Sequence, residues 1–330
     1  MSNKLNDKMH LAANIFNGPD QVPQRNGYGE GVVEAGRANE NVVVLCCDLT
    51  ESTRSAEFRE TFPGRFVEIG IAEQNMAGIA AGMAFSGKIP YISSYATFSP
   101  GRNWDQIRVS VCYSMANVKI MGAHAGISVG PDGATHQAME DIAITRCLPN
   151  MTVIVPCDYP EAKKAAVSIA EMNGPVYMRF GREKVPVITT EKTPFQIGRA
   201  ETYKRGGDVT VVACGSLVYE ALLASDELSG EGIDVRVINC HTIKPIDSDT
   251  IIKAAEETGA LVTAEEHQVH GGLGSAVAEV VSQNCPVPIE YVAMMDRFGE
   301  SGEPDELMKK FGLSAPGIVS AVKRILKRKE

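Results

Sequence analysis

The residue that most suggests chemistry is Glu73, a carboxylate between two apolar runs in IGIAEQNMAGIAAGMAF. Apolar surroundings disfavour the charged form of a carboxyl group, so the group can hold or share a proton near neutral pH. The neighbouring Gln74 and Asn75 offer hydrogen bonds without adding charge. The alternative is structural, because the helix dipole stabilises an acid in the first turn of a helix. Glu73 is therefore a candidate for proton chemistry or for a helix start.

A second group of polar side chains lies in GPDGATHQAMED, where Asp132 and His136 are four residues apart. The glycines and proline predict a turn, and a helix is expected from about Gln137. We expect the carboxylate and the imidazole to project from one loop on the C-terminal side of a strand, where open α/β sheets bind ligands. Turn and cap chemistry is the alternative for Asp132. A histidine at a helix start gains nothing from the dipole, which favours a function for His136.

Cations and aromatic rings supply two further candidate groups. Arg179 and Arg182 lie at the end of an apolar strand in YMRFGREKVPV, where a guanidinium can clamp a phosphate or a carboxylate. A solvated surface position is the alternative for each arginine. Phe98 and Trp104 flank a Pro-Gly turn, and they either pack in the core or form a stacking platform for a flat heterocycle.

Strands and helices alternate along the chain, and they must position these residues. Several strands are continuous Val/Ile runs, which is typical of parallel strands covered on both faces. We therefore expect an α/β fold with right-handed crossovers. The predicted strands are 41–47, 88–95, 117–124, 151–157, 175–180, 208–215, 233–240, 260–266 and 288–294. The predicted helices are 27–39, 73–85, 103–116, 137–147, 160–172, 217–229, 247–258, 275–284 and 315–328.

The chain is long enough for two domains, and its 330 residues divide best at the polar segment TTEKTPF, 189–195. We place the first domain at 1–190 and a smaller one at 191–330. The second domain contains EEHQVHGGLGS, where Gly271, Gly272 and Gly274 precede a helix. These glycines form either a phosphate cradle or, as we favour, a tight strand-to-helix packing contact.

Composition excludes several classes of partner and compartment. The formal net charge of −9 and the lack of a Lys/Arg-rich run outside the C-terminal helix end argue against nucleic acid. No apolar stretch approaches the roughly 20 residues that span a bilayer, and the polar N-terminus does not resemble a signal peptide. The eight cysteines form no CxxC pair, so we expect buried free thiols in a cytoplasmic protein rather than a metal site.

Five segments together resemble the transketolase family: IGIAEQNMAGIAAGMA, SYATF, GPDGATHQAMED, GREKVPVI and TIKPID. They match its pyrimidine-binding domain and its C-terminal domain, in family order, over about residues 20–325. The resemblance implies thiamine diphosphate chemistry, in which Glu73 hydrogen-bonds N1′ of the aminopyrimidine and so activates the thiazolium carbon that attacks a ketose. It also implies that Phe98 stacks on the pyrimidine and that Asp48 lies near the cofactor. Trp104 stands where the family has another aromatic residue.

The same resemblance assigns substrate-binding residues. Arg25, Ser52, Arg182 and His136 fall on positions that grip the sugar phosphate, and Asp132 on one that reads a sugar hydroxyl. Of the two strand-end arginines, Arg182 fits the family pattern better. Two departures leave the lining of the site open: Ala134 replaces the usual proline, and Arg102 stands where related synthases have a basic residue.

A missing motif predicts a partner. Transketolases hold the diphosphate and Mg²⁺ with a Gly-Asp-Gly sequence and a later Asn, and no Gly-Asp-Gly occurs here. The resemblance therefore implies the C-terminal subunit of a split transketolase, whose N-terminal subunit supplies the metal ligands. The implied assembly is an α₂β₂ tetramer with two-fold symmetry.

The activity that this implies is transfer of a two-carbon ketol unit between phosphorylated sugars, with the pentose phosphate pathway as the default setting. A 1-deoxyxylulose-5-phosphate synthase-like half is an alternative, although the strand end RFGRE differs from that family. A 2-oxo acid dehydrogenase β subunit is another, although its second motif lacks DG-x-THQ. A non-enzymatic regulatory half is a third, against which the presence of Glu73, Phe98 and His136 argues.

Overall fold

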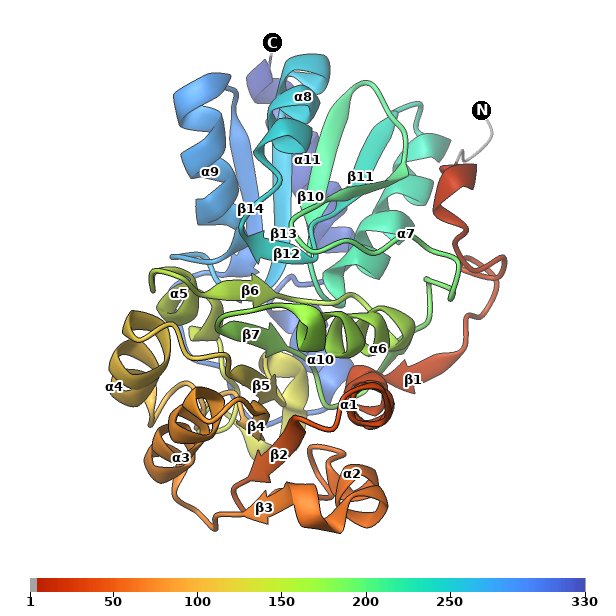
Figure 1. Ribbon diagram of the computed structural model, residues 1–330. Coiled ribbons are helices and arrows are strands. Elements are labelled where there is room, and N and C mark those ends of the chain that lie inside the picture. The colour runs from red at the N-terminus through yellow and green to blue at the C-terminus, as the bar shows by residue number, and fades with distance from the viewer. Residues whose placement is uncertain (1–4, 330) are drawn as a thin grey trace.

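The strands form two main sheets with helices packed on both faces of each, as the alternating sequence pattern predicts (Figure 1). The computed structural model describes residues 5–329. The chain is therefore an α/β protein of two domains. No helix among these residues is long and apolar enough to cross a membrane.

The first sheet has seven strands in the order β12-β6-β7-β5-β4-β2-β3. All of its neighbouring strands are parallel except β12, which runs antiparallel to β6. Strands β2 and β5 are buried along their whole length, because helices cover both faces. The strands are β2 (Val42–Cys46), β3 (Phe66–Glu68), β4 (Ile89–Tyr95), β5 (Lys119–Ala123), β6 (Thr152–Ile154), β7 (Val176–Arg179) and β12 (Thr242–Lys244).

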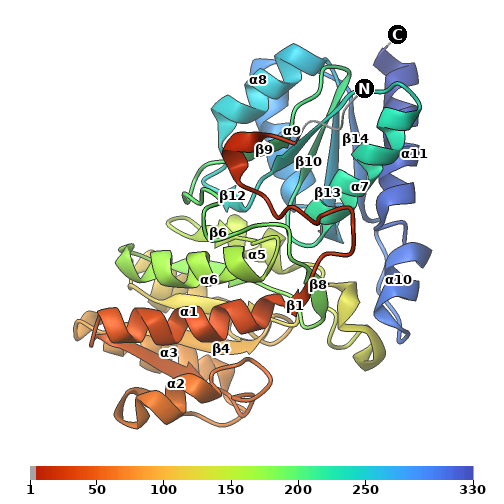
Figure 2. The same ribbon diagram turned by 90° about the vertical axis from the view of Figure 1, so that its right-hand side faces the viewer.

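The second sheet has five strands in the order β14-β13-β10-β11-β9, with only β9 antiparallel to its neighbour. Residues 5–19 run beside this domain before the chain enters the first one (Figure 2). The backbone amide of Asn6 donates to Tyr203, and Ile15 packs in the core of the second domain. The strands are β9 (Glu201–Lys204), β10 (Val209–Ala213), β11 (Val235–Asn239), β13 (Leu261–Gln268) and β14 (Ile289–Met294).

The helices bury one face each against these sheets. Asp158 caps the helix that follows it, since its carboxylate accepts a hydrogen bond from the amide of Glu161. The larger helices are α1 (Gln24–Ala38), α2 (Ala56–Thr61), α3 (Glu73–Phe85), α5 (Asp141–Arg146), α6 (Tyr159–Ser168), α7 (Leu217–Gly230), α8 (Ser248–Thr258), α9 (Leu273–Asn284), α10 (Pro304–Lys310) and α11 (Ala315–Lys329). Short helical segments are η1 (Asp7–Met9), η2 (Pro63–Arg65), α4 (Trp104–Gln106), the π-helix η3 (Ile107–Tyr113), η4 (Ile127–Asp132) and η5 (Ile169–Glu171).

All nine predicted strands are present, and the differences lie in short elements. Strands β1 (Gln21–Pro23) and β8 (Lys184–Pro186) pair with each other in a separate two-stranded sheet. Strand β12 belongs to the second half of the sequence but extends the sheet of the first half. The limits 1–190 and 191–330 therefore stay a prediction, because the two halves share a sheet and a continuous apolar core.

The eight cysteines are free thiols, as predicted, and six of them are buried. The prediction of burial is wrong for Cys147, which is exposed, and Cys285 is half-buried. Cys147 follows helix α5 at the surface, and its thiol donates to the carbonyl of Ile144.

Candidate active site

The candidate residues meet at the carboxyl edge of the first sheet. Phe98 follows β4, Arg182 follows β7 and Glu73 follows β3. These strands are parallel members of one sheet, so the segments after them emerge at the same edge. This is the edge at which open α/β sheets bind ligands, and it is where we expected the site.

Glu73 is buried at the first position of α3, with 3% of its side chain exposed. Its surroundings are not only apolar, as the sequence suggested. Nη1 of Arg102 lies 3.2 and 3.1 Å from the two carboxylate oxygens, and the Ser94 hydroxyl donates to one of them at 3.4 Å. The turn after β4 brings Arg102 back over the start of α3. The carboxylate is thus paired with a cation.

A cluster of four aromatic rings lies beside Glu73. Tyr95 and Phe98 stack with centroids 5.9 Å apart, and His124 stacks on Tyr95 at 4.0 Å. His136 meets the edge of Phe98 at 5.5 Å. The loop that carries His136 is therefore brought against the aromatic residue that the sequence linked to the cofactor.

Trp104 lies apart from this cluster. Its indole N–H donates to the carbonyl of Ile144 at 2.6 Å, and its ring packs against the main apolar core. The ring that stacks on Phe98 is instead that of Tyr95, which the sequence analysis did not select. A cofactor contact by Trp104 stays a prediction that this geometry does not support.

His124 lies at the centre of a group of cations. It directly follows β5, has a positive φ of 55° and is 2% exposed. Burial, which is the largest cause, and the nearby charges of Arg25, Arg182, His136 and Arg54 together lower its pKa from 6.5 to about 3. Its Nδ1 atom has no hydrogen-bond partner among the described residues. The sequence analysis missed both His124 and Arg54.

This burial makes a pH dependence of stability that can be tested. As the pH falls from 6.5 towards 3, the unfolded chain gains a proton at residue 124 that the folded chain does not bind, so stability is lost. The variant His124→Gln should therefore lose less free energy of unfolding between pH 6.5 and 4.5, by about 2 kcal/mol. Urea unfolding at the two pH values measures this difference, with His10→Gln at an exposed histidine as the control. Equal losses in all three proteins would contradict the prediction.

Arg25 and Arg54 are held close to each other by backbone and side-chain contacts. Arg25, in the first turn of α1, donates to the carbonyl of Ser52 at 3.0 Å, and Arg54 donates to Asn26 at 3.0 Å. Burial lowers the pKa of Arg25, and the charges of Arg54 and Arg182 add to this effect. The positive charges of these arginines repel one another, so a bound anion would stabilise the cluster. The predicted Ser52 contributes its backbone here.

Arg182 reaches from the end of β7 to the loop that contains Asp132. Its Nη1 lies 3.6 Å from the Asp132 carboxylate and donates to the Val129 carbonyl at 3.3 Å. Arg179 has a different role. It is buried, pairs with Asp141 at 2.8 Å and donates to the Glu266 carbonyl at 2.6 Å. The structure separates the two arginines, since only Arg182 belongs to the candidate site.

The second domain holds the loop 126–137 in place. The Glu266 carboxylate accepts a hydrogen bond from the Ser128 amide at 2.7 Å, and a Cβ atom at Gly126 would lie 2.2 Å from that carboxylate. Gln137 donates to backbone carbonyls of the loop and to that of Glu300 at 2.9 Å. The helix predicted from Gln137 begins only at Asp141, because the Gln137 side chain is used to close the loop.

Asp48 has an exposed side chain and a positive φ of 58°. Its backbone amide donates to Glu68 at 2.7 Å, which fixes the loop after β2. This places the carboxylate at the same sheet edge as the other candidates. Its role towards a cofactor stays a prediction.

The glycine cluster before α9 is a packing feature. A Cβ atom at Gly272 would lie 2.0 Å from the Glu265 carboxylate, and one at Gly274 would lie 2.6 Å from the Tyr291 ring. The first amides of α9, those of Leu273 and Gly274, already donate to Glu265 at 2.7 and 2.8 Å. A carboxylate of the protein therefore occupies the place that a phosphate would take.

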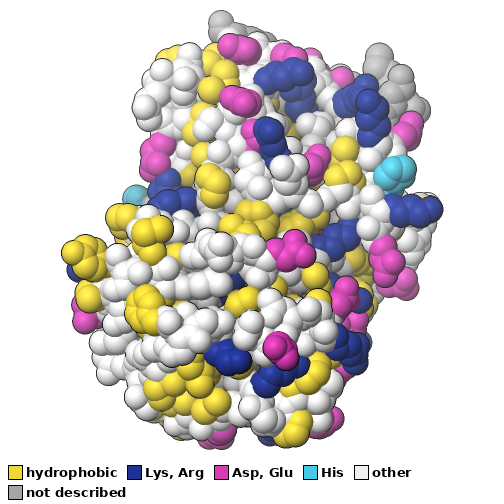
Figure 3. Space-filling view, viewed as in Figure 1, with side chains coloured by type: hydrophobic (Ala, Val, Ile, Leu, Met, Phe, Trp, Pro, Cys, Tyr) yellow, Lys and Arg dark blue, Asp and Glu magenta, His cyan; other side chains and the backbone are white. Residues whose placement is uncertain are grey.

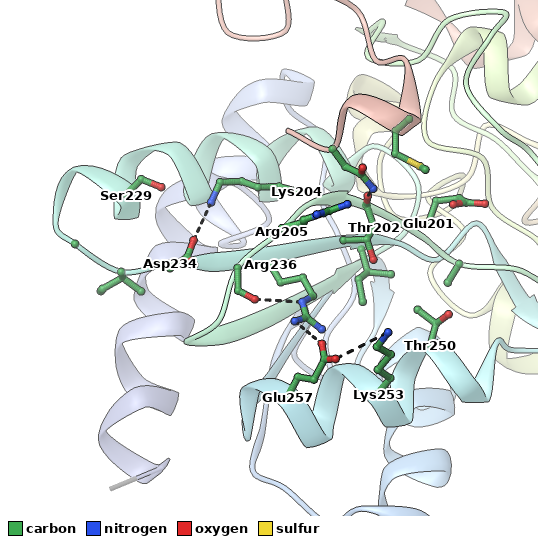
Figure 4. A pocket seen from close by; sticks show the side chains of 17 residues that line it. Glu201, Thr202, Lys204, Arg205, Ser229, Asp234, Arg236, Thr250, Lys253 and Glu257 are labelled. Carbon is green, nitrogen blue, oxygen red and sulfur yellow. Dashed lines mark hydrogen bonds and ion pairs between the residues drawn. The ribbon is translucent and has the colours of Figure 1, made fainter. Parts of the chain in front are cut away.

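The second domain has a groove whose lining differs from that of the candidate site (Figure 4). It has a volume of about 880 Å³ and runs along β9. Its charges pair largely with one another: Arg236 with Glu257 at 2.7 Å, and Lys204 with Asp234 at 3.9 Å. Among residues 5–329, no group of three or more His, Cys, Asp or Glu side chains is placed to hold a metal ion.

Comparisons with known proteins agree with this geometry. The chain matches the family described as "Transketolase, pyrimidine binding domain" over residues 20–187 and "Transketolase, C-terminal domain" over residues 198–318. The chain belongs to the transketolase family. Relatives of similar length include proteins that are named as a subunit or a section of a transketolase.

Three of these relatives cover almost the whole chain. The "6-deoxy-6-sulfo-D-fructose transketolase subunit SqwH" of Clostridium sp. is 43% identical, over 92% of this chain and 95% of its own. The "putative transketolase C-terminal section" of Methanocaldococcus jannaschii is 45% identical, over 92% and 96%. A solved "split gene transketolase, inactive beta4 tetramer" is 44% identical with a TM-score of 0.87, over 94% and 100%. The chain is thus a transketolase-type subunit of a split enzyme.

Proposed function

We propose that this chain is the C-terminal subunit of a thiamine diphosphate-dependent transketolase that moves a two-carbon ketol unit from a ketose phosphate to an aldose phosphate. The observation that carries the proposal is that one sheet edge holds two chemically different groups side by side: a buried carboxylate with an aromatic ring, and a group of cations. A buried carboxylate, Glu73, lies beside the aromatic Phe98. The cationic group of Arg25, Arg54 and Arg182 lies around His124, which stacks in the same ring cluster.

The residues present fit the aminopyrimidine end of thiamine diphosphate. Glu73 offers a buried carboxylate that can hold a proton at a ring nitrogen, and Phe98 offers an aromatic ring for stacking. The cofactor, when bound, supplies the nucleophilic carbon and the electron sink for ketol transfer. Two buried atoms have no hydrogen-bond partner among the described residues: Nδ1 of His124 and Nε of Arg25. Such atoms support a polar ligand beside the pyrimidine position.

The chain's other residues bind and orient the sugar phosphate. Arg25 and Arg182 hold the phosphate, and Asp132 accepts a hydrogen bond from a sugar hydroxyl. His136 lies between the loop and the aromatic cluster, where it can donate or accept a proton at a substrate oxygen. Glu73 and His136 are thus the catalytic candidates. The relatives' names differ in the sugar they print, and we propose pentose phosphates as the substrates.

The second part of the site belongs to a partner in this proposal. An N-terminal subunit binds the diphosphate and Mg²⁺, and two copies of each chain form an α₂β₂ tetramer. Exposed apolar side chains on or beside α3 and η3 support such a partner: Ile71, Phe85, Tyr113 and Met115 are 64–84% exposed. Hydrophobic side chains gather at the lower left of Figure 3, where α3 and α4 lie in Figure 1.

Purification of the tagged chain from its native lysate tests the proposal. We expect a co-eluting chain that carries Gly-Asp-Gly and a later Asn. The mixture, but neither chain alone, should convert xylulose 5-phosphate and ribose 5-phosphate when thiamine diphosphate and Mg²⁺ are present. Two variants form a matched pair. Tyr113→Asp should weaken the co-elution at least about tenfold, because a tyrosine that becomes buried in an interface is a typical hot spot. Ser282→Asp, on the exposed side of α9, should leave the co-elution unchanged. A chain that elutes alone and still binds thiamine diphosphate tightly would overturn the assignment.

A further inference from the structure

Arg102 contacts both groups that the proposed function reserves for the pyrimidine ring. Its Nη1 bridges the two oxygens of Glu73 at 3.2 and 3.1 Å. Its guanidinium carbon also lies 4.0 Å from the centroid of the Phe98 ring, in cation–π contact. One side chain therefore covers a hydrogen-bonding group and a stacking surface at the same time.

A guanidinium and a ring nitrogen compete for this carboxylate. Arginine does not release its proton in a protein, so the Arg102 guanidinium is a permanent positive charge beside the Glu73 carboxylate. A ring that shares a proton with Glu73 needs one of the same two oxygens. The Ser94 hydroxyl donates to one of them as well, which leaves few free acceptor positions.

The two partners differ in their freedom to move. Glu73 is 3% exposed and fixed at the start of α3, where Asn103 also donates to its backbone carbonyl. Arg102 is 48% exposed, and Glu73 is the only carboxylate it pairs with among residues 5–329. The long arginine side chain can therefore leave into solvent, whereas the carboxylate stays.

We propose that Arg102 is a placeholder for the pyrimidine ring: its guanidinium occupies Glu73 and the face of Phe98 in the unloaded chain and leaves both when the cofactor binds. This inference rests on the proposed function, since it needs an aminopyrimidine at Glu73. Until the ring arrives, the pair keeps the buried carboxylate from being left without a charged partner. The competition also lowers the affinity for the cofactor.

The test is a binding titration rather than an activity assay. The complex of the chain with its co-purified partner is titrated with thiamine diphosphate and Mg²⁺ in a calorimeter. Arg102→Gln should bind the cofactor about two- to fivefold more tightly than wild type, because a half-exposed ion pair is worth little more than this. Arg37→Gln, which removes an exposed arginine from α1, is the control for net charge and should bind as wild type does.

A double-mutant cycle identifies the partner of Arg102. In the Glu73→Gln background, Arg102→Gln should no longer tighten binding, because the competing pair is already gone. Unchanged or weaker binding by Arg102→Gln in the wild-type background overturns the placeholder role and leaves the proposed function standing. A wild-type complex that does not bind thiamine diphosphate at all refutes the proposed function, and the placeholder role fails with it.

Discussion

Replacing Glu73 by Gln is expected to lower turnover of the two-chain enzyme by a factor of roughly 10² to 10⁴ while the chain keeps its fold. The amide has nearly the same volume as the carboxyl group, so the packing at the start of α3 is conserved. It can still accept a hydrogen bond, but it cannot hold a proton and return it. The loss of the pair with the half-exposed Arg102 costs at most about 1 kcal/mol of stability.

Turnover at saturating thiamine diphosphate and the midpoint of urea unfolding are the two measurements. The control is Glu57→Gln, which makes the same chemical change in the first turn of α2, at an exposed position. We expect the control to keep both wild-type values. If Glu73→Gln turned over as fast as wild type, Glu73 would be a helix-start residue only, which is the structural alternative for this position.

The regular elements could be predicted because their patterns are long. The predicted helix 73–85 matches α3 at both ends, and the strand 88–95 differs from β4 by one residue. The strands that were missed have three or four residues, too few to show a period of two. Strand β12 was also missed because its pairing with β6 joins segments about 90 residues apart, which no local pattern encodes.

The site was predictable where it follows a strand end or a motif. Glu73, Asp132, His136 and Arg182 all lie at the expected edge of the sheet. His124 obeys the same rule, since it is the last residue of the apolar run NVKIMGAH, and that signal was available. Arg54 gave no such signal, because it comes from an irregular segment with a positive φ of 66°.

The pairing of Arg102 with Glu73 illustrates what the sequence does not encode locally. The two residues are 29 positions apart, and their contact depends on how the turn after β4 returns to α3. The apolar residues on both sides of Glu73 predicted that it lies in an apolar pocket, and the prediction of burial is confirmed. They could not predict that a cation enters that pocket from another turn.

Replacing Arg182 by Ala is expected to raise the KM for phosphorylated acceptor sugars by roughly 10- to 100-fold, with a much smaller effect on unphosphorylated ones. A charge-assisted hydrogen bond to a phosphate contributes about 1.5 to 3 kcal/mol, which corresponds to this range. Arg182 is well placed for this role because it is one-third exposed at the sheet edge and adds to the positive charge around His124. Steady-state kinetics with matched phosphorylated and unphosphorylated aldoses measure the two effects.

The comparison between acceptors matters because Arg182 also lies 3.6 Å from Asp132. If its main task were to hold Asp132, the substitution would misplace a group that reads a sugar hydroxyl, and the KM of both kinds of acceptor would rise equally. Equal effects would therefore remove Arg182 from the phosphate-binding role. Arg205→Ala, at an exposed arginine of the groove along β9, should change neither KM. Arg182→Lys should recover part of the lost affinity for phosphorylated sugars, since lysine keeps the charge but not the planar pair of donors.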